Sequence, residues 1–306
     1  MTTQELLQQL INALSLGTIY ALFALGYALI FSVLGVLNLA HSAVFTSGAV
    51  IGLLIVLYAN LPPPLQLPLA FVGAMIGAGL LGVVLELVAF RPLRRRGAPR
   101  ISQLISSIGA ALLIVNITQL VFQNLFSTTE AYFPDGLIPT QTIQLGGGVS
   151  VQPIRLIILA VSLVLMVLLQ YLVNRTRVGR QMRAVAFNER TSRLLGINVS
   201  RVYLLTFFIA GTLGGAGGLL YGLAFTRVTP FVGQDIALVG LTAIVLGGLG
   251  SIPGAVIGGF VVALLQTFSV VIGGSSYRDA VVFIAFFLIL LLRPQGLLGH
   301  SDQSRA

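Results

Sequence analysis

The sequence lacks lysine, cysteine and tryptophan, and it is poor in charge of either sign. Only 8% of its 306 residues are charged, whereas a soluble globular domain carries roughly 25%. A chain of this length can bury a large core, so the deficit of charge is not an effect of size. Most of the molecular surface must therefore face something other than water.

Each absence excludes a class of function. Without cysteine the chain has no disulfide framework, no thiolate chemistry and no cysteine metal site. Without lysine it cannot supply the P-loop residue that reaches the β- and γ-phosphates of a nucleotide. If the protein acts in an ATP-driven process, another polypeptide must therefore hydrolyse the ATP. The only histidines are His41 and His300, and the sequence contains no metal-binding helix motif, paired carboxylates or catalytic triad, which argues against an intramembrane enzyme.

The apolar residues form runs long enough to cross a bilayer. A hydrocarbon core ~30 Å thick needs about 20 residues of helix. The predicted membrane segments are residues 10–34, 43–58, 65–90, 101–126, 154–173, 202–225, 236–249, 255–272 and 280–292. Segments 236–249 and 280–292 are short enough to be re-entrant or tilted pieces. We therefore expect an all-α, polytopic transmembrane bundle of about eight to nine spans or half-spans, with no strands, as a single domain over residues 1–306.

Arginine predicts the orientation of this bundle, because cytoplasmic loops of membrane proteins carry an excess of positive residues. Two clusters between membrane segments are predicted to be cytoplasmic: Arg91, Arg94, Arg95, Arg96 and Arg100, and then Arg175, Arg177, Arg180, Arg183, Arg190, Arg193 and Arg201. The loop 127–153 contains Glu130 and Asp135 but no arginine, so it should be external. The C-terminal tail then lies inside and the N-terminus outside. On this interpretation the net charge of +9 reflects membrane topology and not nucleic-acid binding.

The cytoplasmic loop 174–201 contains a predicted short helix. Asn188 can cap a helix that begins at Glu189, and Gly196 can end it. Its side chains divide into an apolar group and a charged group: Leu194, Leu195 and Ile197, and Arg190 and Arg193. The pattern alone favours a helix lying on the cytoplasmic leaflet over one that docks into a cytoplasmic partner.

Polar residues within the apolar runs are candidates for a substrate path. Asn38 and His41 lie three residues apart, so on a helix they would share a face. They could bond neighbouring helices and hold a break between the first two runs, or, together with Ser42, line a path through the membrane. The residues do not decide between these alternatives. Glu86 is expected to pair with a nearby arginine such as Arg91.

Glycine marks two segments with different predicted roles. The run 211–218 should form a close-packing helix face, because small residues let backbones approach within a bilayer. The run 247–254 combines glycine with proline and should break a helix. Asp235, just before a short apolar run, suits the first turn of a helix.

Four stretches, distributed over nearly the whole chain, are similar to one known family. They are residues 17–26, the Gly-x-x-Asn-x-Ala-His motif at 35–41, the Arg-Ala-x-Ala…Arg-x-x-x-Leu-Leu-Gly-Ile-Asn pattern at 183–198, and the glycine-rich segment 237–255. In this order they resemble the permeases of branched-chain amino-acid ABC importers. Ser42 stands where that family usually has glycine, and Phe187 where its cytoplasmic loop commonly has an acidic residue.

The resemblance implies a role for each part of the chain. The chain would form the translocation path for branched-chain or other neutral amino acids in the bacterial plasma membrane. Its partners would be a second homologous permease, an external substrate-binding protein and two ATPase subunits, which use ATP and Mg²⁺ while this chain binds no cofactor. By the resemblance, the residues that contact the ATPase are Glu189, Arg190, Arg193, Leu195, Gly196, Ile197 and Asn198.

Two other functions remain possible at this point. A permease for urea or short amides belongs to the same class. A stand-alone channel or secondary carrier belongs to a different class, but ion-coupled carriers usually need intramembrane acids, which are nearly absent here.

Overall fold

Bilayer-length helices follow the apolar runs in the computed structural model, which describes residues 3–59, 62–134, 136–137, 142–144, 150–293 and 295–299. Asp135, the glycines at 146–148 and His300 lie outside the described residues. The long helices are α1 Thr3–Leu34, α2 His41–Tyr58, α3 Pro63–Leu85, α5 Arg100–Phe126, α6 Pro153–Arg175, α9 Val199–Phe225, α11 Ile252–Gly273 and α12 Arg278–Leu292. Over the described ranges, 8 helices are long and apolar enough to cross a membrane, so the predicted polytopic bundle is confirmed.

Helix α10, Val232–Gly247, corresponds to the short segment 236–249. Its 16 residues rise about 24 Å, which is less than the ~30 Å of a hydrocarbon core. It begins beside the first turns of α2, where the Gly233 amide donates to the Thr46 hydroxyl at 2.9 Å. At its other end the Leu297 amide donates to the Leu246 carbonyl at 2.7 Å. The helix is therefore a half-span, and Asp235 lies in its first turn as predicted.

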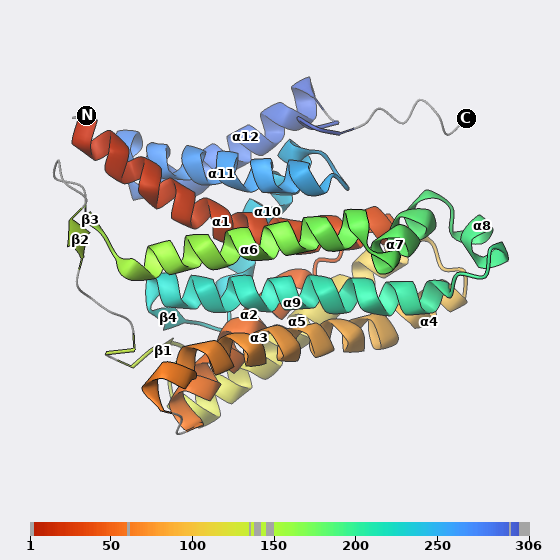
Figure 1. The fold of residues 1–306 in the computed structure, drawn as a ribbon, viewed down its shortest axis with the longest axis horizontal. Coiled ribbons are helices and arrows are strands. Elements are labelled where there is room, and N and C mark those ends of the chain that lie inside the picture. The colour runs from red at the N-terminus through yellow and green to blue at the C-terminus, as the bar shows by residue number, and fades with distance from the viewer. Residues whose placement is uncertain are drawn as a thin grey trace.

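The two ends of the bundle carry different elements (Figure 1). The start of α1 lies at the same end as the short strands β1 Ala131–Tyr132, β2 Ile143–Gln144 and β3 Ser150–Val151. The arginine-rich helices α4 Arg91–Arg95, α7 Arg177–Phe187 and α8 Glu189–Leu194 lie at the opposite end. This separation agrees with the predicted external loop and the two predicted cytoplasmic clusters.

The strands correct the expectation of a purely helical chain. β1 pairs antiparallel with β4, Arg227–Val228, and β2 pairs antiparallel with β3. Each strand has only two residues, so the pairs tie the external segment to the bundle and to itself without forming an extended sheet. Glu130, beside β1, accepts from the Tyr132 hydroxyl at 2.8 Å and from Arg227 at 3.3 Å. The hydrogen bond from Tyr132 to this carboxylate raises the pKa of Tyr132.

Glycines on α9 bring three helices into close contact. A Cβ atom at Gly211 would lie 2.5 Å from the Ala78 carbonyl oxygen of α3. One at Gly218 would overlap the carbonyl oxygen of Phe45 in α2. The predicted close-packing face at 211–218 is thus confirmed, and backbone contact replaces side-chain interdigitation there.

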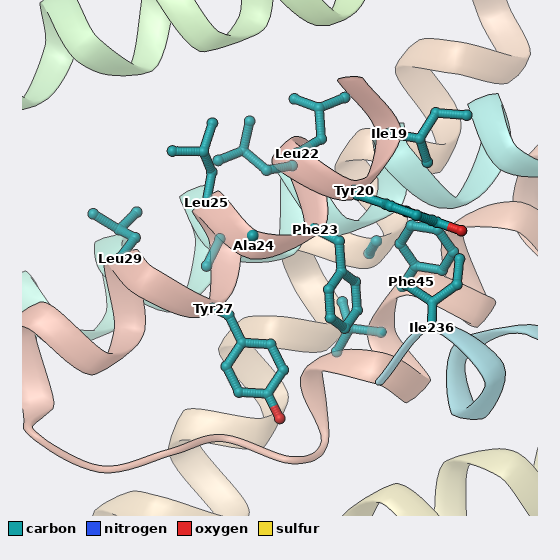
Figure 2. Close-up of a cluster of buried hydrophobic side chains, with 14 of the residues drawn as sticks. Ile19, Tyr20, Leu22, Phe23, Ala24, Leu25, Tyr27, Leu29, Phe45 and Ile236 are labelled. Atoms are coloured by element: carbon teal, nitrogen blue, oxygen red, sulfur yellow. The ribbon is translucent and has the colours of Figure 1, made fainter. Parts of the chain in front are cut away.

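The buried core is centred on α1. Figure 2 shows Phe23 and Tyr27 on one side of this helix, with Phe45 of α2 and Ile236 of α10 beside Phe23. All four side chains are almost completely buried. Helix α1 therefore packs against both α2 and the half-span α10.

Candidate functional site

The break between α1 and α2 is built from glycine and asparagine. Gly35 ends α1 with a φ of 66°, a left-handed conformation that glycine adopts without strain. The Asn38 side-chain oxygen accepts from the Ala40 amide at 3.1 Å, and the Asn38 carbonyl accepts from the His41 amide at 3.1 Å. Asn38 therefore precedes α2, so it is not helical and does not share a helical face with His41. The left-handed Gly35 and the bond between the Asn38 side chain and the backbone therefore interrupt the helix between α1 and α2.

His41 is the first residue of α2, and its ring is enclosed by protein. Its ring centroid lies 5.1 Å from that of Phe23 and 5.5 Å from that of Tyr27. Gly26 makes room for the ring, because a Cβ there would stand 2.5 Å from His41 Cε1. The Nε2 atom has no hydrogen-bond partner among the described residues. The neighbouring Ser42 is also buried, and its hydroxyl donates to the Leu39 carbonyl at 3.0 Å.

These positions support the structural alternative for Asn38, which holds the helix break. In this conformation Asn38, His41 and Ser42 all lie inside the packing of the subunit, with 1%, 1% and 5% of their surface exposed. Their assignment to a substrate path stays a prediction.

Helix α8 forms as the sequence predicted. The Asn188 side chain accepts from the Thr191 amide at 2.9 Å, which caps the helix at Glu189. Gly196, with a φ of 80°, ends it. Asn198 then caps α9 by accepting from the Arg201 amide at 3.1 Å.

The apolar residues of this segment do not share one environment. Leu194 and Leu195 are 84% and 75% exposed, and Phe187 is 87% exposed. Ile197 instead packs against the core. We refer to Phe187, Leu194 and Leu195 as the apolar tip; Figure 1 shows α8 at the extreme of the arginine-rich end, away from the bundle.

Helix α7 is a part of this surface that the sequence analysis missed. The Thr176 hydroxyl caps it by accepting from the Gly179 amide at 3.1 Å. Met182 and Val185 are its buried apolar residues. The Arg183 guanidinium donates to the Val173 carbonyl, one of the last carbonyls of α6, which have no partner within the helix. Helix α7 thereby fixes the position of α8 relative to the membrane helices.

A buried ion pair lies beside this surface, where α3 continues through a π-helix, η1 Glu86–Phe90, into α4. Glu86, with a side chain 0% exposed, pairs with a nearby arginine as predicted, but this arginine is Arg94 and not Arg91. The wider π turn adds a residue, so position i+8 takes the direction that i+7 has in a regular helix. Pro92 explains the wide turn, because it lacks the N–H that a regular helix needs.

The ion pair is connected to α8 through Tyr203 of α9. The Arg94 guanidinium carbon lies 4.0 Å from the centroid of the Tyr203 ring, a cation–π arrangement. The Glu189 carboxylate, at the start of α8, in turn interacts electrostatically with the Tyr203 hydroxyl. Electrostatic and ring interactions thus link α8 through Tyr203 and Arg94 to Glu86, inside the bundle.

Among the described residues no group of three histidine, aspartate or glutamate side chains could hold a metal ion. The site consists of a polar helix break within the membrane region and a protruding apolar tip at one end.

Comparison with known proteins places this arrangement among transport permeases. The family model described as "Branched-chain amino acid transport system / permease component" matches residues 9–291. The high-affinity branched-chain amino acid transport system permease protein BraD of Pseudomonas aeruginosa is 34% identical over 300 residues, covering 97% of this chain and 96% of BraD. The corresponding permease protein LivH of Escherichia coli K12 is 32% identical, with the same coverage.

A solved structure shows a similar fold. A chain of PsaBC from Streptococcus pneumoniae, in complex with Fab, aligns with a TM-score of 0.50 over 93% of this chain and 91% of that chain. The two chains share 14% sequence identity, so this likeness concerns the fold alone.

Proposed function

The chain belongs to the family of permease components of branched-chain amino acid transport systems, and from this premise we propose how its parts divide the work. It is a multi-pass membrane subunit of an ABC importer, and its place is the bacterial inner membrane. Separate subunits hydrolyse ATP with Mg²⁺, because a chain without lysine cannot build a P-loop. A second homologous permease completes the path, and an external binding protein delivers the solute.

The observation that carries this proposal is the apolar tip. Three large, mostly exposed apolar side chains at the arginine-rich end favour a partner that covers them. The partner we propose is the ATPase subunit, which would receive α8 and the neighbouring Glu189, Arg190, Arg193, Gly196, Ile197 and Asn198. The place of α8 at the far end of the molecule favours this role over a helix lying on the leaflet (Figure 1).

The contacts behind α8 provide a route for transmission. A displacement of Glu189 would act on Tyr203, which contacts Arg94, and Arg94 holds Glu86 at the π-helix of α3. π-Helical turns often occur at functional sites, where a helix can change register. Closure of the ATPases would thus reach α3 and α9, whose glycine-mediated contact adjoins His41 at Gly214. We propose that Asn38, His41 and Ser42 border the path when this contact opens.

The proposed solutes are branched-chain or other neutral amino acids, with urea and short amides as the alternative within the class. Co-expression of this chain with its proposed partners, the ATPases, the second permease and the binding protein, tests this choice of solute. The assembled importer is then reconstituted in proteoliposomes. We expect uptake of radiolabelled leucine that requires ATP and the binding protein. Uptake of urea in place of leucine would establish the alternative, and leucine uptake without ATP would establish a stand-alone carrier.

Replacement of Leu195 by glutamate tests the docking role. Because Leu195 is 75% exposed, folding should be unaffected. A charge at the centre of an apolar contact should weaken ATPase association by at least about tenfold. Co-purification of the ATPase with the tagged permease measures this, together with ATP-dependent uptake.

Two variants control this experiment. Leu195→Met keeps an apolar side chain and should retain the ATPase. Gln181→Glu adds the same charge at an exposed position on α7 and should also retain it. If Leu195→Glu binds the ATPase as well as these controls do, α8 is an interfacial helix and the docking proposal fails.

A further inference from the structure

A cavity of about 230 Å³ opens toward the external end of the bundle, at the end opposite α8 (Figure 1). It is formed where the first half of α1 and the first turns of α6 and α12 meet the last turns of α9 and α11. Two arginines, Arg155 and Arg278, contribute to its wall together with uncharged polar side chains. Leu16, Ile19 and Phe225 line it as well, so the cavity is cationic and apolar at once.

Both arginines are held by neutral groups. Arg155 donates to the Asn12 side-chain oxygen at 2.5 Å. Arg278 donates to the Tyr20 hydroxyl at 2.8 Å, and that hydroxyl donates to Gln266 at 2.6 Å. Over the part of the chain that the structure describes, neither guanidinium forms an ion pair.

This arrangement leaves donors and charge available to a ligand. A guanidinium has five N–H donors in a rigid fork that matches a carboxylate or phosphate. One hydrogen bond from each arginine to a neutral partner orients the fork without neutralising it. The nearby carboxylates of Asp279 and Asp235 act on Arg278 through space, without contact. The cavity thus offers oriented, charge-assisted hydrogen bonds beside an apolar wall.

We propose that this cavity binds a small apolar α-amino acid by its carboxylate, as an external loading site on the permease. The choice of solute rests on the proposed function. The carboxylate would lie against Arg155 and Arg278, and the side chain against Leu16, Ile19 and Phe225. The cavity corresponds to the space of about eight water molecules, which suits such a solute. The phosphate of a lipid headgroup is the other oxyanion within reach of this end.

Saturation-transfer NMR on the purified chain in phosphatidylcholine nanodiscs tests this, because it detects weak binding. We expect L-leucine to give a signal that 4-methylpentanoate, which keeps the carboxylate, displaces. Isopentylamine, which keeps only the ammonium and the side chain, should not displace it. Arg155→Gln and Arg278→Gln should each weaken leucine binding at least about tenfold. Arg227→Gln, an external arginine paired with Glu130, should leave it unchanged.

Other outcomes would overturn the proposal. Displacement by isopentylamine, or equal binding by all variants, would show that no carboxylate is recognised there. If phosphatidylglycerol added to the nanodiscs co-purified with the wild type but not with either variant, and leucine gave no signal, the site would be one for lipid headgroups. Arg155→Gln keeps the experiment decisive if Arg278→Gln, which also loses the bond to buried Tyr20, does not fold. Uptake by the reconstituted importer separates the two claims, because leucine transport without leucine binding here rejects only the loading site.

Discussion

Replacement of Arg94 by methionine is expected to lower the free energy of unfolding by about 3–5 kcal/mol, because it leaves the buried Glu86 carboxylate without its partner. Methionine keeps much of the side-chain volume, so the loss reports the charge and not a cavity. The melting temperature should fall by on the order of 10 °C. Size-exclusion chromatography of heated samples, followed through a fused fluorescent protein, measures this. The fusion supplies the signal, since the chain has neither tryptophan nor cysteine for intrinsic or thiol-dye detection.

The companion variants isolate the ion pair. Arg95→Met removes an exposed arginine from the same helix and should have little effect. The double variant Arg94→Met with Glu86→Met removes both charges and should recover much of the stability, because an apolar pair of similar volume is often tolerated. If Arg94→Met has the same melting temperature as the wild type, the ion pair does not stabilise the fold. The proposed connection from α8 to α3 then has no structural support.

Hydropathy predicted the membrane helices because the bilayer imposes a single requirement on them. A spanning segment must satisfy its own backbone and present about 20 apolar residues, and both demands are visible in a sequence. Even the shortness of α10 was visible, since residues 236–249 are bounded by Asp235 and the glycine-rich break. The β-pairs of the external segment were missed because two-residue strands carry no periodic pattern.

Helix α7 was missed for a different reason. A search for bilayer-length runs passes over an 11-residue surface helix rich in arginine. Its signals were nevertheless in the sequence: Thr176 as a cap, and Val178, Met182 and Val185 spaced along one face.

The polar sites depended on features that no local pattern encodes. Glu86 meets Arg94 only because of the π-helix, and a helical wheel places Arg94 elsewhere. The cavity between Arg155 and Arg278 joins residues more than a hundred positions apart. Its polar and apolar walls come from five helices, so only the tertiary fold brings them together. The α8 caps, by contrast, were predicted in full because they are local bonds between neighbours in sequence.

Replacement of Gly218 by alanine is expected to separate α9 from α2. The added methyl group would overlap the Phe45 carbonyl oxygen and lie 3.1 Å from the Ala49 amide nitrogen. Both are backbone atoms, so no side chain can rotate away, and the helices themselves must move. Overpacking of this kind costs about 1–3 kcal/mol, and here the shift should also loosen the contacts around His41. The same heated-sample chromatography measures the loss.

Gly109→Ala is the matched control, because it makes the same change within another long helix. Gly109 is exposed on α5, and an added Cβ meets nothing within 4 Å. The substitution should stabilise the helix by up to about 1 kcal/mol through propensity alone. The two substitutions should therefore shift the melting temperature in opposite directions, because close packing requires glycine at position 218 but not at position 109. If both substitutions raised the melting temperature, the glycines at 211–218 would not be needed for close contact between α9 and α2. Transmission from α8 to the helix break would then need another route.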